Sequence, residues 1–171
     1  METMQSACMS LGSNSHDAEQ QLDNALAALA ALPDVCVVAC SPRYRTEPQG
    51  YKDQPWFVNQ VVLVQCGAQW QARSLLQAML AIETSMGRRR SADPALRFGP
   101  RCIDIDLLLF DDQQSADPAC LLPHPRMAQR AFVLIPLRDV APERIVADGK
   151  TADQLLAALQ YRQEGENIWQ A

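Results

Sequence analysis

Apolar residues recur at helical spacing in two segments of the chain, residues 18–32 and 73–86. In each segment an apolar residue returns every three or four positions, which places these side chains on one face of a helix. Asp17 and Gln20 resemble a capping box before the first segment, and Pro33 ends it. Both segments are therefore predicted to be amphipathic helices.

Other apolar segments are predicted to be strands, among which residues 35–41 have a β-branched composition. They are residues 6–12, 35–41, 56–66 and 102–110. The tetrapeptide Leu11-Gly12-Ser13-Asn14 predicts a turn after the first strand, and residues 42–55, with their prolines, predict a long irregular loop.

The last third of the chain favours helices. A helical stretch is expected from residue 123 toward Val140, and Thr151 with Gln154 can box a final helix that runs to about Tyr161.

Up to residue 110, the predicted order of elements is strand, helix, strand, strand, helix, strand. This order predicts an α+β fold, a ferredoxin-like sandwich in which helices back an antiparallel sheet, with residues 1–171 forming a single domain.

The composition fits this picture. The chain has 171 residues, 48% of them hydrophobic and 20% charged, and no apolar run approaches the ~20 residues that span a bilayer. Its first ten residues lack the pattern of a secretory signal. The net charge of −5 argues against long nucleic acids and anionic membranes as partners. We expect a cytoplasmic monomer that has small-molecule substrates and no nucleic-acid or membrane partner.

The positive charge is concentrated in residues 88–101. This segment holds five arginines against Asp93 alone, which makes it +4 and leaves −9 for the remainder of the chain. Arginine pairs with phosphate through two parallel hydrogen bonds. The segment is therefore predicted to bind a small anion. The alternative explanation for the use of arginine is a GC-rich genome, which favours arginine over lysine.

Asp104 and Asp106 lie two positions apart in the predicted strand 102–110. Strand periodicity puts both carboxylates on one face, with Cα atoms roughly 7 Å apart and a repulsion on the order of 2 kcal/mol. Oxygen ligands of this kind select Mg²⁺ together with substrate phosphates. The alternative is a solvated strand face, which the neighbouring Arg101 makes less favourable.

The six cysteines do not form a metal pattern. No Cys-x-x-Cys occurs, and two histidines cannot complete a zinc site with these spacings. Most of the cysteines lie in apolar runs, so buried free thiols are predicted.

Three further positions carry polar or aromatic side chains that could serve either packing or binding. Phe57 and Asn59 share one strand face, where a ring and an amide could bind a flat heterocycle or could pack in the core. Glu83 lies on the apolar side of its helix and needs a partner, which could be a nearby arginine or a ligand.

A histidine lies among arginines near residue 125. Prolines on both sides of His124 hold it in a turn, and Arg126, Arg130 and Phe132 follow closely. The histidine could be structural or could contact a ligand. Because the chain has no phosphate-binding P-loop motif, any phosphate must be held by arginines and metals.

Taken in order, these residues resemble the 6-hydroxymethyl-7,8-dihydropterin pyrophosphokinases of folate biosynthesis over residues 11–143. The most specific block is residues 99–106, Gly-Pro-Arg-Cys-Ile-Asp-Ile-Asp. The other blocks are Leu11-Gly12-Ser13-Asn14, Tyr44-Arg45-Thr46, Asp53-Gln54-Pro55 with Phe57 and Asn59, Ile82-Glu83 with Gly87-Arg88, Pro123-His124-Pro125-Arg126, Arg130 with Phe132, and residues 137–142.

The resemblance implies transfer of pyrophosphate from ATP to the hydroxymethyl group of the pterin, with release of AMP and with two Mg²⁺ ions. It implies that Asp104 and Asp106 bind the metals and that they form the catalytic set with Arg88 and Arg101. The implied ATP contacts are Glu83, Arg88, Arg90, Phe98, Arg101, His124 and Arg130. The implied pterin contacts are Thr46, Phe57, Asn59, Asp104 and Phe132. No side chain stands out as a general base.

Some residues depart from the family pattern. Residues 91–95 extend the arginine-rich loop, Phe98 stands where many members have Trp, and Leu80 stands where many have Gln. The extended loop motivates an alternative, a catalytically silent module of the same fold that binds an anionic partner such as RNA through its arginines. The intact pair of Asp104 and Asp106 argues against this alternative, because two acids repel nucleic acid unless metals are bound.

Overall fold

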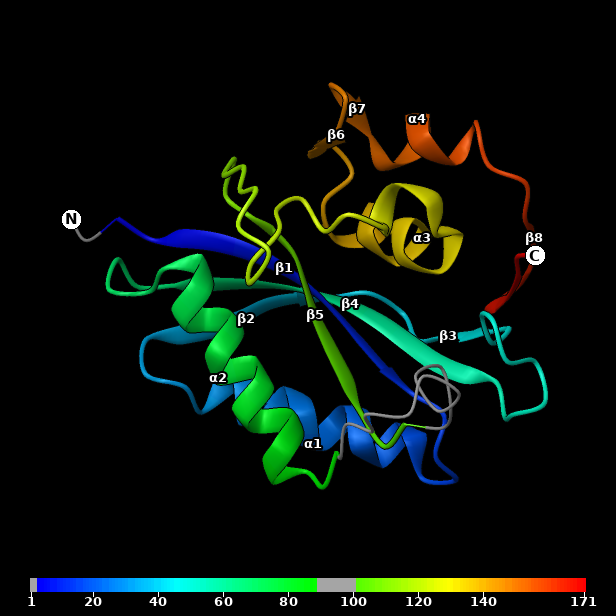
Figure 1. Cartoon of the computed structure of the whole chain (residues 1–171), viewed down its shortest axis with the longest axis horizontal. Helices are drawn as coiled ribbons and strands as arrows, with labels where there is room; N and C mark the ends of the chain where they lie inside the picture. The colour runs from blue at the N-terminus through cyan, green and yellow to red at the C-terminus, as the bar shows by residue number, and fades with distance from the viewer. Residues whose placement is uncertain (1–2, 89–100) are drawn as a thin grey trace.

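The computed structural model describes residues 3–88 and 101–171 (Figure 1). The elements in chain order are β1 (Gln5–Ser13), α1 (Ala18–Ala30), β2 (Val35–Cys40), β3 (Tyr44–Thr46), β4 (Phe57–Cys66), α2 (Ala72–Ser85), β5 (Asp104–Phe110), η2 (Met127–Gln129), α3 (Ala131–Val140), β6 (Ile145–Ala147), β7 (Lys150–Thr151), α4 (Ala152–Leu156), β8 (Arg162–Glu164) and β9 (Asn167–Trp169).

The main sheet has the strand order β5-β1-β4-β3-β9-β8, and β2 also pairs with β4. β4 is long enough to pair with both β2 and β3 along one edge, through its C-terminal and N-terminal parts respectively. All pairs in this sheet are antiparallel except β3 with β9, which run parallel. The sheet is therefore mixed, and the predicted wholly antiparallel sheet is wrong at this one pair, because β9 comes from a distant C-terminal segment.

Helices cover both faces of the sheet (Figure 1). α1 and α2 pack on one face, where Met9, Leu22 and Met79 are fully buried. α3 packs on the other face, in a core with Cys8, Leu134 and others, and α4 packs against α3. Successive residues of β1 point to opposite faces, so this central strand contributes to both cores. Burial of these apolar side chains is the main term that stabilises the sandwich.

The structure corrects three local predictions. β1 continues through Gly12 and Ser13 because both pair with β4, so the predicted turn begins only after Ser13. The Asp17 side chain does not cap α1 and instead accepts hydrogen bonds from Ser15 Oγ and Gln21 Nε2. The predicted loop 42–55 contains β3, a short strand that the prolines around it concealed.

The cysteine prediction is partly wrong. All six cysteines are free, and Cys8, Cys66 and Cys120 are buried, but Cys36 and Cys40 are exposed. These two lie on the uncovered face of β2, an edge strand whose other face packs on the α1 side. Apolar sequence alone does not reveal which face of an edge strand is covered.

The capping box of Thr151 and Gln154 is confirmed at the start of α4, although that helix ends at Leu156. No helix in the described ranges has both the length and the apolar character that crossing a membrane requires.

Candidate active site

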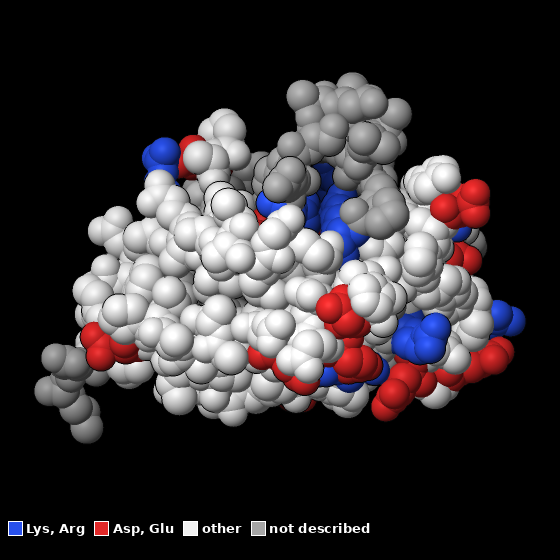
Figure 2. Space-filling view, turned by 90° about the horizontal axis from the view of Figure 1, so that it is seen from below, with Lys and Arg blue, Asp and Glu red and all other residues white. Residues whose placement is uncertain are grey.

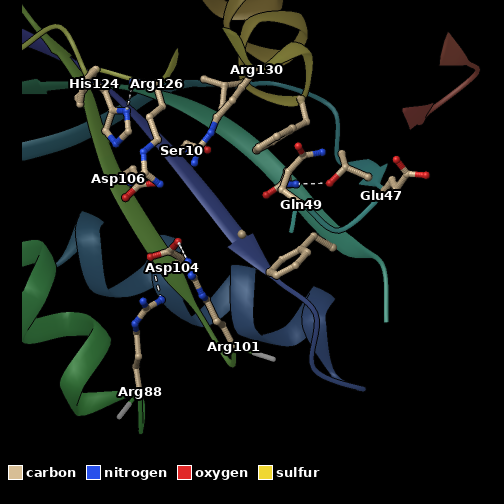
Figure 3. A pocket seen from close by; sticks show the side chains of 17 residues that line it. Ser10, Glu47, Gln49, Arg88, Arg101, Asp104, Asp106, His124, Arg126 and Arg130 are labelled. Atoms are coloured by element: carbon tan, nitrogen blue, oxygen red, sulfur yellow. Dashed lines mark hydrogen bonds and ion pairs between the residues drawn. The ribbon is translucent and has the colours of Figure 1, made fainter. Parts of the chain in front are cut away.

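A polar cavity of about 380 Å³ opens on the α3 side of the sheet, beyond the N-terminal end of α3 (Figure 3). β1, β4 and β5 form its floor, and the segment from His124 to Val133 forms one wall. The residues that line it are Ser10, Gly12, Thr46, Glu47, Gln49, Phe57, Asn59, Arg88, Arg101, Asp104, Asp106, His124, Pro125, Arg126, Arg130, Phe132 and Val133.

β5 presents both aspartates to this cavity. Asp104 and Asp106 line it, whereas Ile103, Ile105 and Leu107 are at most 4% exposed and belong to the core under α1 and α2. The predicted alternation of β5 is therefore confirmed. The apolar face anchors the strand and thereby fixes the direction of the two carboxylates.

Two arginines bind Asp104 (Figure 3). Arg88 Nη1 lies 2.8 Å from one carboxylate oxygen, and Arg101 Nη1 lies 2.7 Å from the other. Arg88 also donates to the backbone carbonyl of Ile103. Arg88 follows α2 and Arg101 precedes β5, so Asp104 joins the two ends of the arginine-rich segment 88–101.

Asp106 has a different environment. Burial and the neighbouring Asp104 charge raise the pKa of Asp106 from 3.8 to about 7, against the opposing effect of the Arg130 charge. In the described part of the chain, no hydrogen bond or ion pair of the Asp106 side chain is found. A half-buried carboxylate beside a second one attracts a cation.

The donor set fits a hard cation. Both groups offer carboxylate oxygens, and the described residues contain no cluster of three His, Cys, Asp or Glu side chains that could enclose a metal. Two carboxylates completed by substrate phosphates are the usual environment of Mg²⁺, which keeps few protein ligands.

Glu83 is not among the residues that line the cavity. Its side chain is 2% exposed, accepts a 2.7 Å hydrogen bond from the backbone N–H of Ile105, and lies 3.7 Å from Arg88 Nε. These contacts hold α2 against β5 and orient Arg88. The hypothesis of a structural partner is thus supported, and a contact with a nucleotide stays a prediction.

His124 is held as a neutral hydrogen-bond donor. Its Nδ1 accepts a 3.2 Å hydrogen bond from the backbone N–H of Arg126, so the proton of the neutral ring lies on Nε2. Burial, followed by the charges of Arg130 and Arg126, lowers the pKa of His124 to about 4. The ring therefore stays uncharged at neutral pH and can donate one hydrogen bond from Nε2.

The opposite side of the cavity carries an amide and two aromatic rings. Asn59 Nδ2 lies 2.5 Å from Thr46 Oγ1, and both side chains are buried. Phe57 and Phe132 also line the cavity, and the Arg130 guanidinium lies 5.6 Å from the centre of the Phe132 ring. A flat ligand with hydrogen-bonding edges would fit this environment.

Nearly all described site candidates come together here. Thr46, Phe57, Asn59, Arg88, Arg101, Asp104, Asp106, His124, Arg130 and Phe132 all line the cavity, whereas Arg90 and Phe98 lie outside the described residues. Sequence reasoning assigned no role to the cavity residues Ser10, Glu47, Gln49 and Arg126. The strand period of β1 could have found Ser10, which shares a face with Gly12, whereas nothing local marks Gln49.

The cavity carries a local excess of positive charge. Arg88, Arg101, Arg126 and Arg130 line it together with three acidic residues. Figure 2 shows a group of Lys and Arg side chains set into a hollow of the surface, with acidic side chains distributed over the outer part of that face. This arrangement focuses the field on a small anion that enters with its own cations.

Fold and site together define a class, a mixed-sheet protein whose carboxylates and arginines are arranged for a phosphate-bearing ligand and a hard cation. Residues 8–142 match the family model of 7,8-dihydro-6-hydroxymethylpterin-pyrophosphokinase (HPPK). The chain belongs to this family.

Two bacterial relatives agree with this assignment. A 2-amino-4-hydroxy-6-hydroxymethyldihydropteridine pyrophosphokinase of Methylorubrum extorquens is 41% identical over 156 residues, covering 91% of this chain and 94% of that protein. A protein of the same name from Pseudomonas aeruginosa is 41% identical over 158 residues, covering 92% and 94%.

Solved structures show the same fold. A Plasmodium falciparum HPPK-DHPS matches with a TM-score of 0.69 and 17% sequence identity, over 91% of this chain and 44% of that one. This chain thus spans less than half of that protein, and at such identity the likeness concerns the fold alone.

Proposed function

We propose that this protein transfers the pyrophosphoryl group of ATP to the hydroxymethyl group of 6-hydroxymethyl-7,8-dihydropterin and releases AMP, a step of folate biosynthesis. The observation that carries the proposal is the cavity itself. Its carboxylate pair faces four arginines, and its other side offers an amide and two aromatic rings. One cavity thus has the chemistry for a polyphosphate and for a flat heterocycle.

The triphosphate would bind at the arginine side. Arg88, Arg101 and Arg130 offer planar donors to phosphate oxygens, and His124 Nε2–H offers one neutral donor. The family resemblance adds Arg90, Phe98 and Glu83 as nucleotide contacts. Arg88 and Arg101 would balance the charge that shifts toward the leaving AMP, which is the basis for including them with Asp104 and Asp106 in the catalytic set.

The pterin would bind at the amide side. Thr46 and Asn59 would bond to its edge, Phe57 and Phe132 would cover its two faces, and Asp104 would lie near its reactive end. The 2.5 Å hydrogen bond between Asn59 and Thr46 supports this, because it fixes the amide in one orientation before the ligand arrives. A preorganised amide loses little entropy on binding.

Asp104 and Asp106 would hold two Mg²⁺ ions with the phosphates of ATP. When bound, the ions neutralise the phosphate chain and polarise the β-phosphorus. The raised pKa of Asp106 supports this assignment, because a carboxylate in such surroundings gains a favourable partner when a cation binds.

The chain's own contribution is mainly positioning. The hydroxyl oxygen of the pterin forms a bond to the β-phosphorus while the bond from that phosphorus to the α,β-bridging oxygen breaks, and AMP leaves. Holding the two substrates in line within one cavity lowers the barrier by removing the entropy of their encounter. No side chain is assigned as general base, and the hydroxyl proton goes to solvent or to product.

We also propose that β1-α1-β2-β4-α2-β5 forms a ferredoxin-like sandwich within a single domain spanning residues 1–171. The antiparallel order β5-β1-β4-β2 supports this. The protein would work as a cytoplasmic monomer without nucleic-acid or membrane partners, in keeping with its net charge of −5.

The decisive experiment is a product assay. The protein is incubated with ATP, Mg²⁺ and 6-hydroxymethyl-7,8-dihydropterin, and the nucleotide products are separated. We expect AMP in amounts equal to the pterin consumed. Release of inorganic pyrophosphate instead would indicate a nucleotidyltransferase, and absence of both products would reject the proposal.

The same preparation tests the alternative, a catalytically silent module that binds RNA. That module would form no AMP and would bind RNA with an affinity that falls steeply as salt rises. The acidic pair disfavours it, because Asp104 and Asp106 lie within the arginine group that RNA would have to contact.

A further inference from the structure

Gln170 lies outside the stretch that matches the family model, yet it contacts the cavity residue Gln49 and the two neighbours of the cavity residue Arg130. Its side-chain Oε1 accepts a 2.8 Å hydrogen bond from the backbone N–H of Ala131, and its Nε2 donates a 2.9 Å hydrogen bond to the carbonyl of Gln129. Its own carbonyl accepts a 3.1 Å hydrogen bond from Gln49 Nε2. The side chain therefore holds the backbone on both sides of Arg130.

Arg130 needs these hydrogen bonds because it lies at the start of α3. It is the N-cap of α3 in an extended conformation, and no side chain caps that helix through it. The first N–H groups of a helix need partners from outside the helix. Gln170 Oε1 supplies one to Ala131, which is the function that a Ser or Asp cap performs in other helices.

Gln170 is itself firmly placed. The preceding strand β9 pairs with β3, and Glu47 donates a backbone hydrogen bond to the carbonyl of Ile168, which is 1% exposed. Trp169 packs edge-on against Trp56 with ring centres 5.2 Å apart. Gln170 thus connects the sheet to the backbone around Arg130.

We propose that Gln170 is a positioning residue that sets the direction of the Arg130 side chain toward the triphosphate, and that its carbonyl fixes Gln49 at the cavity wall. The inference rests on the proposed function. Without the Gln170 side-chain amide, the N–H of Ala131 and the carbonyl of Gln129 lose these hydrogen-bond partners. The Arg130 guanidinium then samples other directions.

The test compares Gln170→Ala with Gln163→Ala. Gln163 is exposed on β8, and its side-chain amide donates a hydrogen bond to the nearby Gly165 carbonyl, so it controls for loss of a glutamine near the same segment. For Gln170→Ala we expect about tenfold lower kcat and about tenfold weaker binding of a non-hydrolysable ATP analogue with Mg²⁺, with pterin affinity changed less than about threefold. Gln163→Ala should match the wild type.

A double-mutant cycle shows whether the effect passes through Arg130. In an Arg130→Ala background, Gln170→Ala should cause no further loss of analogue affinity, measured by calorimetry. An equal loss in both backgrounds would overturn the proposal, as would wild-type kcat and analogue affinity in Gln170→Ala. Gln170→Glu keeps an oxygen that accepts from Ala131 and should recover part of the affinity for the ATP analogue. If Gln170→Ala unfolds, the double-mutant cycle is run with Gln170→Glu instead.

The two proposals fail in different ways. If the wild type forms no AMP, the proposed function is wrong. If the wild type forms AMP and Gln170→Ala behaves as the wild type does, only the positioning role is wrong.

Discussion

Asn59 on β4 donates a hydrogen bond of 2.5 Å to Oγ1 of Thr46 on β3. The two strands are antiparallel neighbours, and the bond crosses between them at the cavity wall. The other end of the amide faces β1, where a Cβ on Gly12 would lie 2.4 Å from Asn59 Oδ1. The orientation of this amide is therefore fixed from two sides.

Gly12→Ala should weaken pterin binding. The added methyl group forces Asn59 away from Thr46, since backbone and strand pairing hold residue 12 in place. We expect about tenfold weaker pterin binding and a loss of about 1–3 kcal/mol of folding free energy from overpacking. Fluorescence titration with the pterin measures the first, and urea unfolding measures the second.

Gly165→Ala is the matched control for that experiment. Gly165 lies in the turn between β8 and β9 with φ +59, and nothing lies within 4 Å of an added Cβ. It should lose stability through backbone strain while pterin affinity is retained. Equal pterin affinity in both variants would contradict the role of Gly12.

Asp106→Asn should abolish AMP formation without destabilising the protein at pH 8. In the folded protein the pKa of Asp106 is raised to about 7, so the folded state binds its proton more tightly than the unfolded state does. The metal-free wild type therefore loses stability as pH rises from about 4 to 7, and Asp106→Asn should lack this component. Thermal unfolding between pH 4 and 8 without Mg²⁺ measures it.

Asp112→Asn, an exposed acidic position, controls for loss of one negative charge. It should retain both the activity and the pH profile of the wild type. If the stability of Asp106→Asn depends on pH in the same way as that of the wild type, the protein environment does not raise the pKa of Asp106 and the prediction is wrong.

Arg101→Ala should slow the reaction far more than it weakens pterin binding. It removes one of the two cations that the described residues place on Asp104, and with it a proposed phosphate donor, while the hydrogen bond between Asn59 and Thr46 remains. We expect kcat to fall about 100-fold or more with pterin affinity changed less than about threefold. The control is Arg73→Ala, whose surface pair with Asp117 is exposed. Equal losses in kcat and pterin affinity would indicate a structural role.

His124 should remain neutral across the physiological pH range. Because its pKa is lowered to about 4, its ring-proton NMR shifts should be constant above about pH 6 and should change only in acid. The His124→Ala spectrum identifies these signals. A midpoint near pH 6.5 in the metal-free protein would contradict the prediction.

The same shift predicts an acid-side stability component. As pH falls from 6.5 toward 4, the unfolded state takes up a proton that the folded state does not. The free energy of unfolding therefore decreases, and the protein becomes less stable. His124→Ala should lack this component. Its sign is opposite to that of Asp106, so the two variants can be told apart by pH alone.

The sequence by itself determined the elements that rest on periodicity. The alternation of β5 placed Asp104 and Asp106 on one face because side chains of a strand point to opposite sides in turn. α1 and α2 followed from their apolar spacing, and the ends of α2 lie within about one residue of the prediction.

Only the tertiary structure decided which residues from distant segments meet. Gln170 contacts the backbone around Arg130, and Glu83 contacts Ile105, because the sheet order brings their elements together. β3 and β9 pair although each is short, since neighbouring strands supply their partners. Local sequence carries period and turn chemistry, whereas burial, pKa shifts and ligand geometry depend on contacts made across long sequence separations.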